Sequence, residues 1–173
     1  MKKRRVVKHS KGELLCGEVL RSLPVDLVKG QFPLGPFFFD YLCSYQGRLY
    51  LIEYDGIQHF QYVKFIHRRE INYRSRVKAD ANKTALALVH GYTVIRIDYT
   101  QDTAEAIQQH LLAGFRQDKR LYLSRPEFYG AILSSIIKPS IYQGLIVSPI
   151  NPPQIPRPRL VVVEACSQQP LHG

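Results

Sequence analysis

Hydrophobic and polar positions along the chain follow two periods, and together they predict a single α/β domain. Apolar residues with high β-propensity predict four strands, at residues 25–32, 37–43, 48–55 and 92–99. Amphipathic spacing predicts four helices, at residues 10–23, about 81–90, about 103–113 and about 126–137. The predicted order is α-β-β-β-α-β-α followed by a short helix, which gives a mixed sheet with helices packed against it.

Several helix ends carry recognisable signals. Ser10 and Glu13 have the spacing of a capping box, and Pro24 stops the helix that they begin. Asp80 is a predicted cap for the helix at 81–90, which Gly91 ends. These signals place the first helix directly before the strands and the second between the third and fourth strands.

Composition changes at both ends of this pattern. Residues 1–8 form a basic arm, which is either a solvated tail or a phosphate-binding or nuclear-import segment. Seven of the eleven prolines lie between residues 139 and 170, so residues 139–173 are predicted to be an extended, proline-rich tail. The predicted domain therefore covers residues 9–138.

The formal net charge of +10 favours a polyanionic partner, nucleic acid before an anionic membrane, over a merely basic protein. The sequence has no apolar run of about 18 residues and no apolar segment after its basic start, so we expect neither membrane insertion nor secretion. Cys16, Cys43 and Cys166 are odd in number and lack CxxC spacing. They indicate a reducing, intracellular compartment, either cytoplasm or nucleus.

A polar cluster follows the strand at 48–55. Glu53 and Asp55 lie two residues apart and so face the same side of that strand. Two carboxylates at the end of a buried strand repel each other and lose hydration, and a bound cation is the usual compensation. Gly56 lets the chain turn and brings Gln58 and His59 near the same place.

Two further carboxylates are expected to join this cluster. Asp40 interrupts an apolar strand, and the short hairpin at 44–48 brings it beside Glu53. Glu13 is either only a helix cap or a fourth acidic group of the site. Clustered carboxylates without cysteine favour a hard cation, Mg²⁺ or Mn²⁺, and the basic charge then suggests hydrolysis of phosphodiester bonds in a nucleic acid.

Residues 61–83 are strongly basic. They hold seven Lys or Arg residues against two acidic ones, with aromatic residues at 62, 65 and 73. Cations interleaved with rings suit a phosphate backbone and exposed bases, although an ordinary charged helix face is the alternative. The candidate nucleic-acid-binding residues are Lys64, Arg68, Arg69, Arg74, Arg76 and Lys78.

Residues 39–41 (FDY) and, thirteen residues on from Asp40, residues 53–59 (EYDGIQH) resemble the PD-(D/E)XK nuclease superfamily. The closer resemblance is to its very-short-patch repair endonuclease-like branch. Gly12-Glu13, Asp80-x-x-Lys83 and residues 91–97 are similar to flanking blocks of that branch, so the resemblance covers about residues 9–100. It implies a restriction-endonuclease-like α-β-β-β-α-β core and metal-dependent cleavage of DNA.

By position, the resemblance makes Asp40 and Glu53 metal ligands and Glu13 the helix carboxylate that holds the metal or its water. Asp55 stands where many members carry a catalytic lysine, so it would bind a second metal or accept a proton instead.

The resemblance leaves roles for the remaining polar residues. Gln58 and His59 would position water or the phosphate, with His59 either a general base or a structural histidine. Lys83 or Lys78 would supply the missing cation, unless Lys83 is simply a solvated side chain.

Three functions follow from this pattern. The first is an Mg²⁺- or Mn²⁺-dependent endonuclease that cleaves DNA. The second is a nuclease-like module that binds nucleic acid without cleaving it, which the missing motif lysine suggests. The third is a junction- or flap-resolving enzyme, a use that often requires a homodimer.

Overall fold

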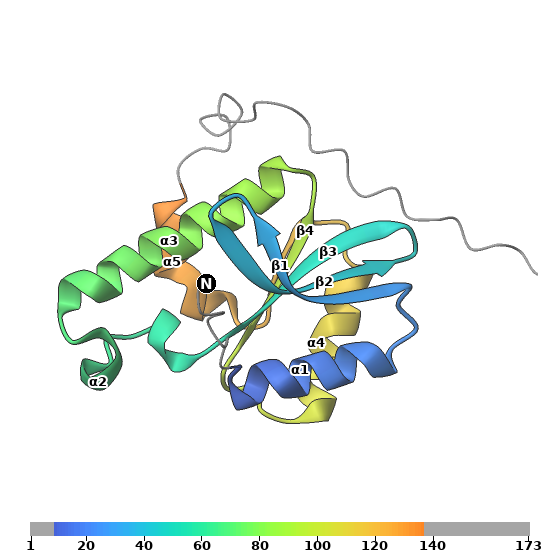
Figure 1. Ribbon diagram of the computed structural model, residues 1–173, viewed down its shortest axis with the longest axis horizontal. Helices are drawn as coiled ribbons and strands as arrows, with labels where there is room; N and C mark the ends of the chain where they lie inside the picture. Colours follow the sequence, from blue (N-terminus) through green and yellow to red (C-terminus); the bar gives the residue numbers. More distant parts are fainter. Residues whose placement is uncertain (1–8, 137–173) are drawn as a thin grey trace, which may run out of the picture.

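The computed structural model describes residues 9–136, which form an α/β fold around a five-stranded mixed sheet (Figure 1). The strands lie in sequence order: β1 (Leu27–Leu34), β2 (Phe37–Tyr45), β3 (Arg48–Asp55), β4 (Thr93–Asp98) and β5 (Leu121–Leu123). The first three are antiparallel, because tight turns join them. The pairs β3–β4 and β4–β5 are parallel, since a helix crosses over between the strands of each pair.

Helices cover both faces of the sheet. On one face, α1 (Lys11–Ser22) and α4 (Ala104–Arg116) bury an apolar cluster against β3 and β4 that includes Leu20, Ile52 and Leu111. On the other face, α3 (Glu70–Val89) packs over Leu51 and Val94. Two pairs of short helical segments complete the described fold. The first pair, after β3, is η1 (Ile57–His59) and α2 (Lys64–His67). The second pair, after β5, is η2 (Pro126–Tyr129) and α5 (Gly130–Ser135), which packs on α3. The predicted α/β class with a helix-flanked mixed sheet is therefore confirmed.

The first helix begins with the predicted capping box. The Ser10 hydroxyl accepts from the backbone N–H of Glu13 at 3.1 Å, and the Glu13 carboxylate accepts from the Ser10 N–H at 2.6 Å. Gly12 is essential to how α1 approaches the sheet, because a Cβ at this position would lie 2.0 Å from the Tyr54 ring. The helix therefore delivers Glu13 to the end of β3.

The predicted start of the second helix is wrong. Asp80 does not cap a helix at 81–90; it lies in the middle of α3, buried against the sheet, and Arg69 is the N-cap residue. The basic residues between 74 and 78 occupy the exposed side of this helix, while Val77 and Ala81 supply a narrow apolar stripe. That sparse stripe gives residues 70–79 only a weak helical periodicity in the sequence.

Smaller differences concern the end of the domain. The three-residue strand β5 was not predicted, because so short a segment shows no alternation. Pro126 does begin the last helical segment, but as the 3₁₀ turn η2, and α5 ends at Ser135. The basic arm at 1–8 and the tail at 139–173 lie outside the described residues.

None of the helices within residues 9–136 combines the length and apolar character needed to cross a membrane.

Candidate functional site

The ladder between β2 and β3 ends at Asp40 and Glu53, where side chains replace backbone pairing. The last regular pair is Tyr41 opposite Ile52. Beyond it, the N–H of Asp40 donates to Oε1 of Glu53 at 3.1 Å, and the N–H of Tyr54 donates to Oδ2 of Asp40 at 2.8 Å. Each carboxylate is thus oriented by the backbone of the neighbouring strand.

Asp40 and Glu53 open into a cavity of about 360 Å³. Six of the seven predicted catalytic residues line it: Glu13, Asp40, Glu53, Gln58, His59 and Lys83. Its remaining lining comes from His9, Ser10, Tyr54 and Gly56. The structure therefore brings together residues from the first helix, two strands, the η1 turn and α3, and three of the four predicted acidic groups are among them.

Gly56 connects β3 to η1, the turn that supplies Gln58 and His59. A Cβ on residue 56 would lie 2.4 Å from the Gln58 side-chain oxygen, so only glycine lets that amide fold back over the chain. Gln58 and His59 follow in η1, and both line the cavity. The predicted proximity of this pair to the carboxylates is thus a direct result of the short turn.

The acidic groups of the cavity are electrostatically crowded. Burial, the nearby Glu53 and a hydrogen bond with Glu13 raise the pKa of Asp40 to about 10. Burial also raises the pKa of Glu53, although Lys83 and Arg96 oppose the shift. Asp40 therefore retains a proton at neutral pH in the protein by itself.

Lys83 is the cation nearest to these carboxylates. Its Nζ lies 2.6 Å from Oε2 of Glu53 and 4.6 Å from the centroid of the Phe39 ring. Its side chain is only 13% exposed, so Lys83 is not a solvated surface lysine. Lys78, the other candidate for the missing cation, is exposed and does not line the cavity.

The chemistry of the donors suits a hard divalent cation. Glu13, Asp40 and Glu53 offer carboxylate oxygens, the ligands that Mg²⁺ and Mn²⁺ prefer, and a cation would relieve the crowding that makes Asp40 hold a proton. Among residues 9–136, no three acidic, histidine or cysteine side chains already converge as a ligand set. Binding would therefore have to draw these carboxylates closer together.

Asp55 faces a different environment from Glu53. Both of its oxygens accept from the Arg96 guanidinium, at 2.8 Å and 2.6 Å, and one also accepts from the Tyr129 hydroxyl at 3.0 Å. Asp55 is 1% exposed and does not line the cavity. The structure thus separates it from the other three predicted metal ligands and commits its oxygens to an ion pair.

Sequence reasoning assigned no site role to Arg96 or Asp80. Arg96 is fully buried; burial opposes its charge, but Asp55 and then Asp80 and Glu53 outweigh that effect and raise its pKa well above the ordinary value. Asp80 lies 2.7 Å from Nδ1 of His59, and this hydrogen bond, with Arg96, lowers the pKa of Asp80 despite its burial. An arginine inside the apolar strand TVIRID was the signal that a buried acidic partner had to exist.

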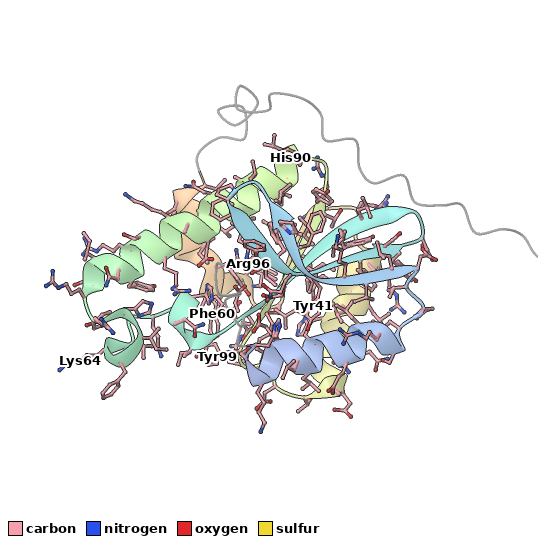
Figure 2. The ribbon with its side chains drawn as sticks, viewed as in Figure 1. Tyr41, Phe60, Lys64, His90, Arg96 and Tyr99 are labelled. Atoms are coloured by element: carbon pink, nitrogen blue, oxygen red, sulfur yellow. The ribbon has the colours of Figure 1, made fainter. Side chains whose placement is uncertain are left out.

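The predicted nucleic-acid-binding residues share one feature, exposure, and lie on α2, the turn after it and the first half of α3: Lys64, Arg68, Arg69, Arg74, Arg76 and Lys78. Apolar residues among them are also exposed, with Phe65 at 96%, Ile71 at 65% and Ile66 at 49%. Figure 2 shows Lys64 projecting at the end of α2, far from Arg96 at the centre of the molecule. This basic and apolar surface, residues 62–78, is named the basic tip.

Comparisons of the chain with protein-family models, with curated proteins and with solved structures find no match.

Proposed function

We propose that this protein is an Mg²⁺- or Mn²⁺-dependent endonuclease that hydrolyses phosphodiester bonds in DNA, with a core like that of the PD-(D/E)XK superfamily. The observation that carries the proposal is the contact of Lys83 with Glu53 beside Asp40 in one cavity. Asp55 occupies the position of the usual motif lysine, and Lys83 brings an ammonium group to the same cavity from α3. The hairpin carrying Asp40 and Glu53 and the α3 crossover to parallel β4 also support such a core.

Each residue of the cavity has a defined role in this proposal. Asp40, Glu53 and Glu13 would hold the metal, which would polarise the phosphate and stabilise the charge that develops on it. Lys83 balances the charge of Glu53 and offers N–H donors to a phosphate oxygen. The Gln58 amide can donate to the phosphate or orient the attacking water, and His59 accepts a proton from that water.

The phosphate backbone would lie across the cavity and the basic tip. The basic tip follows η1 in the chain and includes the first half of α3, the helix that also brings Lys83 to the cavity. Six exposed Lys and Arg side chains can replace condensed counterions, which predicts binding that weakens as salt concentration rises. Exposed rings beside them suit bases that are not stacked in a duplex.

The test is a cleavage assay on plasmid, nicked, mismatched, flap and junction DNA, with Mg²⁺, Mn²⁺ or EDTA. We expect metal-dependent cleavage of at least one substrate, and a loss of about 10²–10³-fold in Glu53→Gln and Asp40→Asn, as when one electrostatic stabiliser of a transition state is removed. Asp26→Asn is the matched control, because it makes the same change at an exposed carboxylate beside Ser44, toward the opposite end of β2 from Asp40 and outside the cavity lining. Absence of cleavage by the wild type on every substrate, or unchanged cleavage by Glu53→Gln, would refute the proposal.

A nuclease-like module that only binds nucleic acid is the second candidate. It is favoured by the fact that the carboxylates are already neutralised without metal, Glu53 by Lys83 and Asp40 by its own proton. Calorimetric titration with Mg²⁺ and Mn²⁺, with and without DNA, separates the two functions. Salt-dependent DNA binding without any metal site would favour the binding module, whereas metal binding lost in Asp40→Asn would favour the enzyme.

A further inference from the structure

A buried network centred on Arg96 joins β3, β4 and α3. The Arg96 guanidinium donates two hydrogen bonds to Asp55, at 2.8 Å and 2.6 Å, and one to the Thr84 hydroxyl at 2.8 Å. The same group lies 3.5 Å from Oδ1 of Asp80. Arg96 and Asp55 are each 1% exposed, so the network is closed to solvent on this side.

The network reaches the cavity through His59, whose Nδ1 lies 3.7 Å from Oδ1 of Asp55, beyond hydrogen-bond distance, and closer to Asp80. Asp80 lies against Arg96 through Oδ1 and contacts Nδ1 of His59 through Oδ2, at 2.7 Å. A carboxylate held beside a guanidinium can only accept, so the hydrogen of this bond belongs to His59 Nδ1. In a neutral imidazole the second nitrogen, Nε2, is then without a proton. Nε2 lies on the opposite edge of the ring, and His59 lines the cavity.

We propose that Asp80 and Arg96 are positioning residues that hold His59 as its Nδ1–H tautomer, so that its bare Nε2 serves as the proton acceptor of the cavity. The catalytic meaning of this assignment rests on the proposed nuclease function. The tautomer itself does not, since only the contacts of this network determine it. Asp55 acts by anchoring Arg96 and not by touching the reacting atoms.

The charges of the network suit this task. Asp55 and Asp80 together carry two negative charges against the single positive charge of Arg96, so one negative charge remains and faces His59. That charge stabilises the imidazolium that forms when Nε2 takes a proton. In the hydrolytic step, a water proton moves to Nε2 and the water oxygen bonds to phosphorus. The bond from phosphorus to the leaving ester oxygen breaks, and that oxygen takes a proton from solvent.

The protein contains its own reference for the opposite tautomer. The N–H of Val63 donates to Nδ1 of His67 at 2.9 Å, so neutral His67 carries its hydrogen on Nε2. The two histidines therefore differ in a way that ¹⁵N chemical shifts of the ring nitrogens report directly. Spectra of ¹⁵N-histidine-labelled full-length protein, about two pH units above the ordinary histidine pKa of ~6.5, test the assignment without metal or DNA. The variant His59→Gln identifies the signal.

We expect His59 in the wild type to show the Nδ1–H pattern and His67 the Nε2–H pattern. Asp80→Ala removes the acceptor while keeping a good helix former in α3, and we expect it to shift His59 toward the pattern of His67. Arg96→Lys keeps the buried charge but loses the fork that holds Asp55 and Thr84, so a mixed tautomer is expected. Asp26→Ala, the same change at an exposed site, should leave His59 unaltered.

The outcomes separate this inference from the nuclease proposal. An Nε2–H pattern for His59 in the wild type, or an Nδ1–H pattern that persists in Asp80→Ala, would overturn it even if the protein cleaves DNA. Where cleavage is measurable, Asp80→Ala should lower the turnover rate by about 10²–10⁴-fold, the usual range for general acid–base catalysis. Its DNA affinity should remain that of the wild type, because Asp80 is buried and the exposed cations of the basic tip are unchanged. If Arg96→Lys does not fold, Asp80→Ala alone still decides the question.

Discussion

Glu53 and Asp55 lie two residues apart on the same face of β3, yet they belong to two different kinds of acidic site. Glu53 lines an open cavity with Asp40 and pairs with the lysine Lys83. Asp55 is sealed into an ion pair with Arg96, and both of its oxygens accept hydrogen bonds from buried partners. The difference teaches that a carboxylate's position in a motif does not fix its task. The cation facing it decides whether it can exchange partners or only hold the fold together.

The largest expected effect is on stability, in Asp55→Ala. Removing Asp55 leaves the buried Arg96 guanidinium without its main partner, and breaking a buried pair in this way costs about 3–5 kcal/mol of unfolding free energy. Urea denaturation followed by circular dichroism measures the loss. Glu53→Gln is the matched comparison and should cost less, because the amide oxygen still accepts from the Asp40 N–H and Lys83, unlike Arg96, is 13% exposed and keeps part of its hydration. Equal losses of unfolding free energy in the two variants would contradict the distinction between a structural ion pair at Asp55 and an open site at Glu53.

Tyr129→Phe tests the sealed site more gently. The Tyr129 hydroxyl donates to Asp55 at 3.0 Å, and hydrogen bonds to charged groups contribute about 1.5–3 kcal/mol. We expect a loss in that range with no other change in packing, since the ring remains against Val77 and Ile132. The measurement is again denaturation in urea. An unchanged free energy of unfolding would mean that Arg96 alone suffices to hold Asp55.

Asp40→Asn, unlike the two preceding variants, should raise the free energy of unfolding. The folded protein keeps the Asp40 proton up to about pH 10, whereas the unfolded chain releases it near 3.8, so the folded state binds the extra proton between these values. The contribution of Asp40 to the free energy of unfolding therefore falls as pH rises through that window. Asparagine cannot titrate, so the variant should gain at least about 1 kcal/mol at pH 8, while losing cleavage.

Denaturation of the wild type, Asp40→Asn and the control Asp26→Asn at several pH values between about 6 and 9 measures this slope. A difference between wild type and Asp40→Asn that does not grow with pH would contradict the assignment of the proton to Asp40.

The smallest expected change in stability is at the basic tip, in Phe65→Ala. Phe65 is 96% exposed, so its loss should alter unfolding free energy by less than about 0.5 kcal/mol. Binding to single-stranded or flapped DNA should weaken by about 1–3 kcal/mol, the usual contribution of one stacked base. Fluorescence anisotropy at fixed salt measures it, with Phe38→Ala, an exposed phenylalanine outside the basic tip, as the control. Equal binding by both variants would show that the Phe65 ring does not contact DNA.

Much of the fold could be predicted because local signals and tertiary packing agree. The capping box at Ser10, the turn at Gly47 and the strand at 48–55 each obey a short-range rule, and the structure keeps all three. The start of α3 could not be predicted in the same way. Its buried stripe is made of small residues such as Ala81, whose apolar signal is weak beside the neighbouring charges.

The candidate site was predictable to the extent that its residues are close in sequence or joined by one hairpin. Asp40 and Glu53 follow from strand pairing, and Gln58 and His59 from the turn at Gly56. The partners of Asp55 could not be found that way. Arg96 comes from a strand that pairs with β3 only after the long crossover through α3, and Tyr129 comes from the last helical segment. Spacing along the chain contains no measure of such contacts.

At Asp40 and Glu53, carboxylate contacts replace the backbone hydrogen bonds that pair β2 with β3. The hairpin turn between these strands therefore determines how the two carboxylates lie relative to each other. Glu53 comes thirteen positions after Asp40, and the turn at Gln46 and Gly47 sets their register. Because side chains alternate faces along a strand, a change in this turn that shifted the pairing by one residue would send the two carboxylates to opposite faces of the sheet. Composition and net charge would hardly change. The length of this turn is thus as strict a requirement for the site as the acidic residues themselves.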